Sequence, residues 1–201
     1  ALLEAAGGRA LYVMFPMVSE VWEFDAARPK LHKQLAFLRA KKKLMPERIH
    51  FGAMLEVPAL AEVLDLLLPK LSFLSVGTND LTRFLFAADR ANPKLAQRYD
   101  WLSPSILRFL RRVIQSSVGS GVDVGVCGEM GGRRLEALAL LGIGFRRLSI
   151  TPAAVGPIKE LVRKIDLDEL SAAINGWLAD PAVDIRTELS AWAAAREIET
   201  D

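Results

Sequence analysis

The sequence lacks most of the residues from which disulfide frameworks and soft-ligand metal centres are built. It has one cysteine and two histidines in 201 residues. A single thiol excludes a disulfide framework and a four-thiolate metal site. Neither His32 nor His50 has a partner at ligand spacing. The sequence therefore gives no support to a metal centre built on thiolates or on histidines.

Neither sign of charge dominates, and no long apolar run is present. Lysine and arginine total 26 and aspartate and glutamate total 24, which gives a formal net charge of +2. This near balance excludes a polybasic nucleic-acid-binding module, whose affinity depends on a dense cationic face. No stretch of about eighteen apolar residues exists, which excludes a membrane-spanning helix. Residues 1–4 do not open a signal peptide, so we expect a cytoplasmic protein that binds neither nucleic acid nor membrane.

The sequence does contain a regular alternation of apolar runs and amphipathic helical stretches. Five short apolar runs are expected to form strands, at 11–17, 49–57, 71–76, 122–126 and 147–150. Helical spacing of apolar residues follows each run, with Ser19 as the expected N-cap of the first helix. Strands that alternate with helices predict an α/β fold with a parallel sheet.

Two closures of such a sheet remain open, a doubly wound sheet and a (β/α)₈ barrel. No G-x-G-x-x-G motif follows the first run, which weakens the dinucleotide-binding version of the open sheet. Five units are too few for a complete barrel, which typically needs about 250 residues. In a barrel, about three βα units would be missing before Ala1. The chain would then be a piece of a longer one. We expect another chain or a terminal segment to cover the edge of its first strand, or the piece to be only marginally stable.

Carboxylates follow two of the apolar runs, at the strand ends where parallel α/β proteins gather their functional groups. Glu56 closes the second run, where it would hold a metal ion, cap a helix or pair with an arginine. Asp80 ends the third run, and two carboxylates from adjacent strands can share one Mg²⁺. Taken alone, Asn79 and Asp80 are more typical of a turn followed by a helix N-cap.

Cys127 and Arg90 complete the set of candidate residues. Cys127 ends the fourth run, and a lone cysteine is usually a small buried hydrophobe. A thiol at a strand end can also act as an acid or a nucleophile, depending on its pKa. Arg90 lies in a loop and is expected to be a solvated charge, unless the loop returns over the strand ends, where its guanidinium would match a phosphate.

Several segments together resemble the phosphoenolpyruvate-utilising enzymes. They are MFPM at 14–17, GAMLEVPA at 52–59, FLSVGTNDLT at 73–82, ADRAN at 88–92, YDWLSP at 99–104 and VCGEMGG at 126–132. They occur in order and at consistent spacing over roughly residues 10–165, which makes the resemblance specific. Within the family, residues 84–90 and 132–137 resemble the nitrogen-regulatory branch of Enzyme I, the phosphoenolpyruvate-protein phosphotransferase of the bacterial phosphotransferase system. Pyruvate phosphate dikinase and phosphoenolpyruvate synthase are more distant relatives.

The resemblance implies a (β/α)₈ barrel of the TIM type that binds phosphoenolpyruvate and Mg²⁺ at its C-terminal face. Residues 1–201 would be the C-terminal portion of that domain, an incomplete barrel with about five parallel strands, and residues 167–201 its C-terminal helical segment. By resemblance, Glu56 and Asp80 bind Mg²⁺. Asn79 and Arg90 hold the phosphate, and Cys127 exchanges a proton with the methylene carbon of the enolate.

The resemblance also implies an activity and partners. The expected reaction moves the phosphoryl group of phosphoenolpyruvate to a histidine for relay to a histidine-phosphocarrier protein, leaving pyruvate, and the expected assembly is a homodimer. The family's phosphorylated histidine lies in a separate N-terminal domain, and neither His32 nor His50 has its setting. This chain alone is therefore expected to lack phosphotransfer activity. A non-catalytic dimerisation or interaction domain, and a dikinase or synthase relative, remain as alternatives.

Overall fold

The computed structural model describes residues 1–87 and 100–200. Their centre is a parallel sheet of four strands in the order β1-β2-β3-β4. The strands are β1 (Leu11–Phe15), β2 (Ile49–Leu55), β3 (Phe73–Gly77) and β4 (Asp123–Cys127). Neighbours in the sequence are neighbours in the sheet, as consecutive βα units of a barrel wall require. The predicted α/β fold with a parallel sheet is confirmed, in a form consistent with part of a TIM-type barrel.

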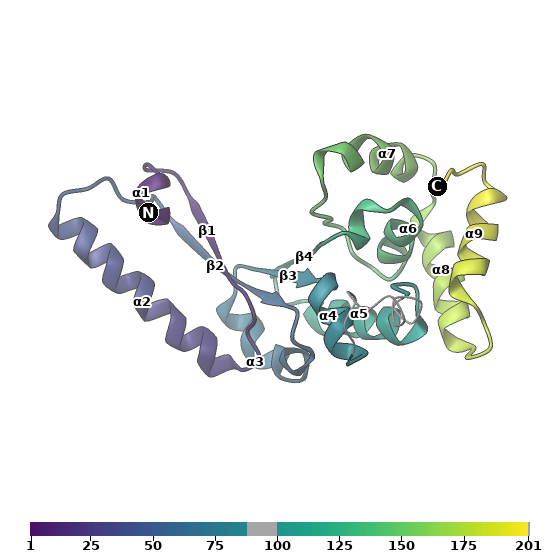
Figure 1. Ribbon diagram of the computed structural model, residues 1–201, viewed down its shortest axis with the longest axis horizontal. Helices are drawn as coiled ribbons and strands as arrows, with labels where there is room; N and C mark the ends of the chain where they lie inside the picture. The colour runs from purple at the N-terminus through teal and green to yellow at the C-terminus, as the bar shows by residue number, and fades with distance from the viewer. Residues whose placement is uncertain (88–99, 201) are drawn as a thin grey trace.

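Helical segments connect the strands and continue after the last one (Figure 1). Before β3 the chain forms α1 (Leu2–Ala5), α2 (Val21–Ala40), η1 (Pro58–Val63), α3 (Leu64–Leu67) and η2 (Leu68–Lys70). After β3 it forms α4 (Thr78–Leu85), α5 (Pro104–Ser117), η4 (Met130–Gly132), α6 (Arg134–Gly142), α7 (Pro152–Val162), α8 (Leu167–Ala179) and α9 (Ile185–Ala194). Figure 1 shows β1, β2 and α2 reaching to one side, while α6 to α9 gather at the other. None of the described helices combines the length and the apolar character that a membrane span needs.

The fifth predicted strand, at 147–150, is reduced to a single bridge between Val126 and Leu148. Two backbone hydrogen bonds hold it, from the Val126 amide to the Arg147 carbonyl at 2.9 Å and from the Ser149 amide to the Val126 carbonyl at 2.8 Å. The pairing stops there because β4 ends at Cys127, one residue after the bridge, and the chain turns at Gly128, where φ is +106°. The segment therefore runs parallel to β4 without a ladder of its own.

The two faces of the sheet have different surroundings. Alternate residues of the strands, among them Leu55, Leu74 and Val126, are buried in the hydrophobic core with the helices. The opposite face is open: Tyr12 is 63% exposed, and its ring stacks on His50 with the centroids 4.4 Å apart. In a closed barrel this open face would be the interior.

The start of α2 differs from the sequence prediction, because its N-cap is Glu20 and not Ser19. The carboxylate of Glu23 reaches back and accepts hydrogen bonds from the Ser19 amide at 2.7 Å, the Ser19 hydroxyl at 2.8 Å and the Glu20 amide at 2.9 Å. Hydrogen bonds from the Ser19 amide, the Ser19 hydroxyl and the Glu20 amide lower the pKa of Glu23 below its ordinary value. A glutamate in the first turn thus satisfies the amides that precede the helix.

Candidate functional site

The candidate site lies at the edge where β2, β3 and β4 end. Leu55 pairs with Val76, and Gly77 pairs with Cys127. Glu56 follows β2 directly, and α4 begins directly after Gly77. The parallel register therefore brings the residues that follow the three strands to one edge of the sheet.

Glu56 is a buried carboxylate whose position is fixed from two sides. It is 5% exposed, and its Oε1 accepts a hydrogen bond from the Met17 amide at 2.8 Å. A Cβ atom added at Gly77 would lie 3.0 Å from Glu56 Oε2, so the carboxylate rests against the end of β3. No cationic side chain pairs with Glu56 within residues 1–87 and 100–200. A buried carboxylate without a counter-charge is costly, so this group is suited to receive a cation.

Asn79 and Asp80 occupy the first turn of α4, and the helix N-cap is Gly77. The interpretation of this pair as a turn followed by an N-cap was therefore wrong, because the helix begins at Thr78, with no intervening turn. The Asp80 carboxylate is partly exposed and lies 3.3 Å from Arg83, one turn along the helix. In the described part of the chain, no group of three or more His, Cys, Asp or Glu residues is placed to hold a metal ion. A protein site for Mg²⁺ needs fewer, because Mg²⁺ keeps several waters and takes one or two carboxylates with substrate phosphates.

Cys127 is half-buried and lines a hollow of about 930 Å³ on the open face of the sheet. Tyr12, Ser75 and Arg147 line the same hollow. The chain turns immediately after the cysteine, at Gly128, where φ is +106°. This conformation favours glycine, and it leaves the thiol at the C-terminal end of β4, facing open space.

The structure brings Asn79 next to the turn that follows Cys127. A Cβ atom at Gly128 would lie 3.2 Å from Asn79 Oδ1, and the Glu129 amide donates to that oxygen at 3.5 Å. Glu56, Asn79 and Cys127 thus belong to one edge of the sheet. Arg90, the other predicted phosphate ligand, lies outside the described residues.

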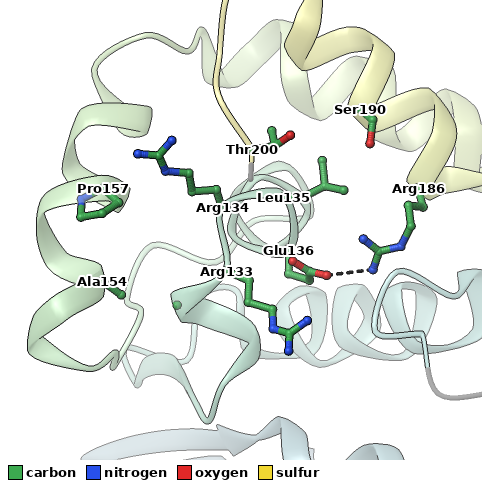
Figure 2. A pocket seen from close by; sticks show the side chains of 10 residues that line it. Arg133, Arg134, Leu135, Glu136, Ala154, Pro157, Arg186, Ser190 and Thr200 are labelled. Carbon is green, nitrogen blue, oxygen red and sulfur yellow. Dashed lines mark hydrogen bonds and ion pairs between the residues drawn. The ribbon is translucent and has the colours of Figure 1, made fainter. Parts of the chain in front are cut away.

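A second hollow, of about 550 Å³, lies beside α6, α7 and α9 and is rich in arginine (Figure 2). Arg134 pairs with Glu199 at 3.0 Å, and Arg133 lies over the ring of Trp101 at 5.0 Å. Arg186 donates to the buried carboxylate of Glu136 at 2.8 Å, the contact drawn as a dashed line in Figure 2. Protein groups therefore engage each of these guanidinium groups.

Arg186 also forms a two-pronged ion pair with Asp100, with Nε at 2.9 Å and Nη2 at 2.7 Å from the two carboxylate oxygens. Burial by itself would raise the pKa of Asp100, but hydrogen bonds from Arg186 and from the Leu102 amide outweigh it and lower the pKa. The Asp100 bond and, after it, the Glu136 bond raise the pKa of Arg186 despite partial burial. Arg186 therefore ties α9 to the start of α6 and to the segment before α5.

Several residues that shape this edge were not predicted from the sequence. Gly77 gives the Glu56 carboxylate its space, the Met17 amide holds it, and Thr78 donates to the Cys127 carbonyl. Gly77 could have been found, because it stands at the end of a predicted strand, two positions before Asn79. The Met17 contact could not, because it joins residues 39 positions apart through a backbone atom.

Comparison with protein families adds an independent observation. Residues 1–167 match the family described as PEP-utilising enzyme, PEP-binding domain. The chain belongs to this family. The family resemblance drawn from the sequence motifs is thereby confirmed at this level.

Curated relatives of this PEP-binding-domain chain carry related names. Phosphoenolpyruvate-protein phosphotransferase of Borreliella burgdorferi is 37% identical over 175 residues, which are 87% of this chain and 30% of that protein. The protein of the same name from Listeria monocytogenes is 35% identical over 92% of this chain and 33% of its own length. A Salmonella typhimurium protein named phosphoenolpyruvate-dependent phosphotransferase system is 34% identical over 92% of this chain and 25% of its own length. The chain thus spans a third or less of these relatives.

Among solved structures, a citrate lyase from Burkholderia xenovorans LB400 has a similar fold. The TM-score is 0.53 at 18% sequence identity, over 94% of this chain and 65% of that structure. At this identity the likeness concerns the fold alone. It is consistent with a parallel sheet in a partial TIM-barrel-like fold.

Proposed function

We propose that this chain forms part of the phosphoenolpyruvate and Mg²⁺ site of a phosphoenolpyruvate-protein phosphotransferase. The observation that carries the proposal is Glu56, a buried carboxylate with no cationic partner in the described ranges. It lies at the end of β2, beside the strand that leads to Asn79 and Asp80. Family membership and the names of the relatives support phosphoenolpyruvate as the substrate.

In this proposal Glu56 and Asp80 hold the metal. When bound, Mg²⁺ would supply positive charge to the phosphate of the substrate, which weakens the bond to the enol oxygen. Asn79 binds a phosphate oxygen through its side-chain amide, and Arg90 is assigned to the same phosphate from the sequence resemblance. The Gly77 position keeps room for the Glu56 carboxylate, because a methyl group there would lie 3.0 Å from Oε2.

Cys127 is the proposed proton donor. The bond from phosphorus to the enol oxygen breaks, its electron pair stays on that oxygen, and a histidine nitrogen outside this chain takes the phosphoryl group. The enolate then accepts the thiol proton at its methylene carbon, which gives pyruvate and a thiolate that regains a proton from water. The position of Cys127 in an open hollow at the strand end supports this role.

The finer assignments follow from the same resemblance. We place the parent protein in the nitrogen-regulatory branch, in the cytoplasm, as a homodimer that passes phosphate to a histidine-phosphocarrier protein. The phosphorylated histidine and the first strands of the barrel would then lie upstream of Ala1. The open face and the free edge of β1 in the four-stranded sheet are consistent with such a missing part.

A second candidate function is a non-catalytic interaction domain. Large apolar side chains are exposed in the N-terminal third, including Leu2 at 66%, Trp22 at 67% and Phe37 at 56%. Association with another protein surface would remove these side chains from water, which is favourable. An interaction domain without catalysis has no use for a buried carboxylate that lacks a counter-charge among the described residues, which is why the catalytic proposal stands first.

Calorimetry of phosphoenolpyruvate binding with and without Mg²⁺ tests the proposal. We would use this chain, a form extended upstream to complete eight strands, and extended forms carrying Asp80→Ala or, as a matched control, Asp65→Ala in the exposed part of α3. Mg²⁺-dependent binding that Asp80→Ala abolishes and Asp65→Ala preserves is the expected result. A folded extended form that does not bind would contradict the catalytic proposal and favour the interaction domain.

A further inference from the structure

Thr78 links two parts of the candidate site, the beginning of α4 and the end of β4. It is the first residue of α4, directly after β3, and it is 1% exposed. Its hydroxyl donates a hydrogen bond to the carbonyl oxygen of Cys127 at 3.1 Å. Its own carbonyl accepts a hydrogen bond from the Thr82 hydroxyl at 2.7 Å. The side chain therefore joins the beginning of α4 to the last residue of β4.

The carbonyl that Thr78 contacts belongs to the peptide at which the chain leaves the sheet. The residue before it, Val126, has its amide and carbonyl bound to the 147–149 segment. The residue after it, Gly128, has φ +106°, and a Cβ atom there would lie 2.8 Å from the Thr78 hydroxyl oxygen. The glycine thus leaves the space that the hydroxyl fills. The orientation of this peptide fixes the backbone of Cys127 and the direction of its side chain.

We infer that Thr78 is a positioning residue that holds the Cys127 thiol in place through the Cys127 carbonyl. The chemical meaning of this role rests on the proposed function. Transfer of the thiol proton to the methylene carbon requires the sulfur at a defined distance from that carbon, and a small misplacement costs much of the rate. By the same contact Thr78 keeps the proton donor in register with Asn79, the next residue of α4.

A purely structural role for the Thr78 hydroxyl would have different consequences. Thr82 offers the comparison, because it is also buried and its hydroxyl binds a backbone carbonyl, but that carbonyl belongs to α4 itself. Replacement of either threonine by valine keeps the branched shape and removes one hydrogen bond. Only the Thr78 change removes a bond to Cys127.

The single cysteine of the chain gives a direct readout of this contact. We would measure the rate constant of Cys127 alkylation by iodoacetamide at one fixed pH, with the melting temperature recorded for each variant. Loss of a hydrogen bond at the end of a strand loosens it locally, so we expect Thr78→Val to raise the rate constant about fivefold. We expect Thr78→Ser, which keeps the hydroxyl, to react at the rate of the unmodified protein. Thr82→Val should also react at that rate.

The outcomes separate this inference from its alternatives. A folded Thr78→Val variant that is alkylated at the rate of the unmodified protein overturns the inference. So does a Thr82→Val variant with the increase expected for Thr78→Val, or a Thr78→Ser variant whose rate differs from that of the unmodified protein. Where Thr78→Val does not fold, Thr78→Ala removes the same bond without adding bulk and is held to the same criteria. The assay contains neither phosphoenolpyruvate nor Mg²⁺, so its failure is distinct from a failure to bind substrate.

Discussion

Two buried glutamates of this molecule have opposite surroundings. Glu136, in the first turn of α6, is 3% exposed and accepts a hydrogen bond from Arg186 at 2.8 Å. Glu56, at the end of β2, is 5% exposed and accepts a bond of the same length from a backbone amide. One carboxylate has its counter-charge within the fold, and the other has none among the described side chains.

The difference distinguishes Glu136, a carboxylate with a structural role, from Glu56, a carboxylate suited to bind a cation. A buried carboxylate paired with an arginine contributes to the order of the elements it joins, and removal of the partner exposes the full cost of the buried charge. A buried carboxylate held only by an amide keeps that cost in the folded state, and a bound cation removes it. Glu136 therefore belongs to the scaffold, and Glu56 to the proposed site.

The strongest test of this contrast is Arg186→Met. The change removes the guanidinium that serves both Glu136 and Asp100 and keeps an apolar stem of similar length. Because Glu136 stays buried without a counter-charge while Arg186 itself is partly exposed, we expect the free energy of unfolding to fall by about 2 kcal/mol. Urea denaturation measures this change.

The control for Arg186→Met is Lys70→Met, which breaks an ion pair of 2.6 Å between two partly exposed side chains, Lys70 and Asp25. An exposed pair of this kind is worth at most about 1 kcal/mol. Addition of Glu136→Leu to Arg186→Met should return much of the lost stability, since no buried charge remains at that position. Equal losses for Arg186→Met and Lys70→Met would show that Glu136 is not a structural charge.

The sequence predicted which segments form the sheet better than it predicted where each strand ends. Apolar runs bounded by polar residues located the four strands of the described sheet, because burial on a parallel sheet demands such runs. The 147–150 run has the same composition, yet it forms one bridge because its partner β4 ends one residue after Val126. Strand length at the end of a sheet depends on the partner and on the next element, neither of which a local pattern contains.

The site shows the same division. The positions of Glu56, Asn79 and Cys127 at one edge follow from strand ends, which the sequence marks with polar residues. The partners of Glu56 and Cys127 do not, because Met17 and Thr78 contact them across 39 and 49 positions of the chain. Nothing in the sequence distinguishes Arg186 from the exposed arginines, since its role arises only when α9 packs beside α6.

The second test uses acid to weaken the Asp100–Arg186 ion pair. The pKa of Asp100 is lowered in the folded state, so its contribution is complete above the ordinary value of 3.8 and is lost as the pH falls through the lowered pKa. We expect Asp100→Asn to cost about 1 kcal/mol near neutral pH, a figure kept small because the pair is partly solvated. The difference from the unmodified protein should shrink below pH 3.8. Urea denaturation at each pH measures this difference in the free energy of unfolding. A difference that stays constant in acid would contradict this assignment.

The smallest expected effect is also the sharpest test of Glu56. Glu56→Gln keeps an oxygen that can accept the Met17 amide and removes the uncompensated charge. Without Mg²⁺ we therefore expect the free energy of unfolding to rise by up to about 1 kcal/mol. Glu136→Gln, its matched partner, should lower it, because Arg186 loses a charged acceptor.

Added Mg²⁺ should make the unmodified protein more stable than the Glu56→Gln variant in thermal melts, the reverse of their order without Mg²⁺. An ion that binds the folded state alone stabilises it in proportion to the logarithm of its concentration over its dissociation constant. The unmodified protein should gain melting temperature with Mg²⁺, and Glu56→Gln should gain none. A metal-free Glu56→Gln variant that loses as much stability as Glu136→Gln would mean that the fold itself compensates the Glu56 charge. The contrast between the two carboxylates would then disappear, and with it the main support for a cation at the end of β2.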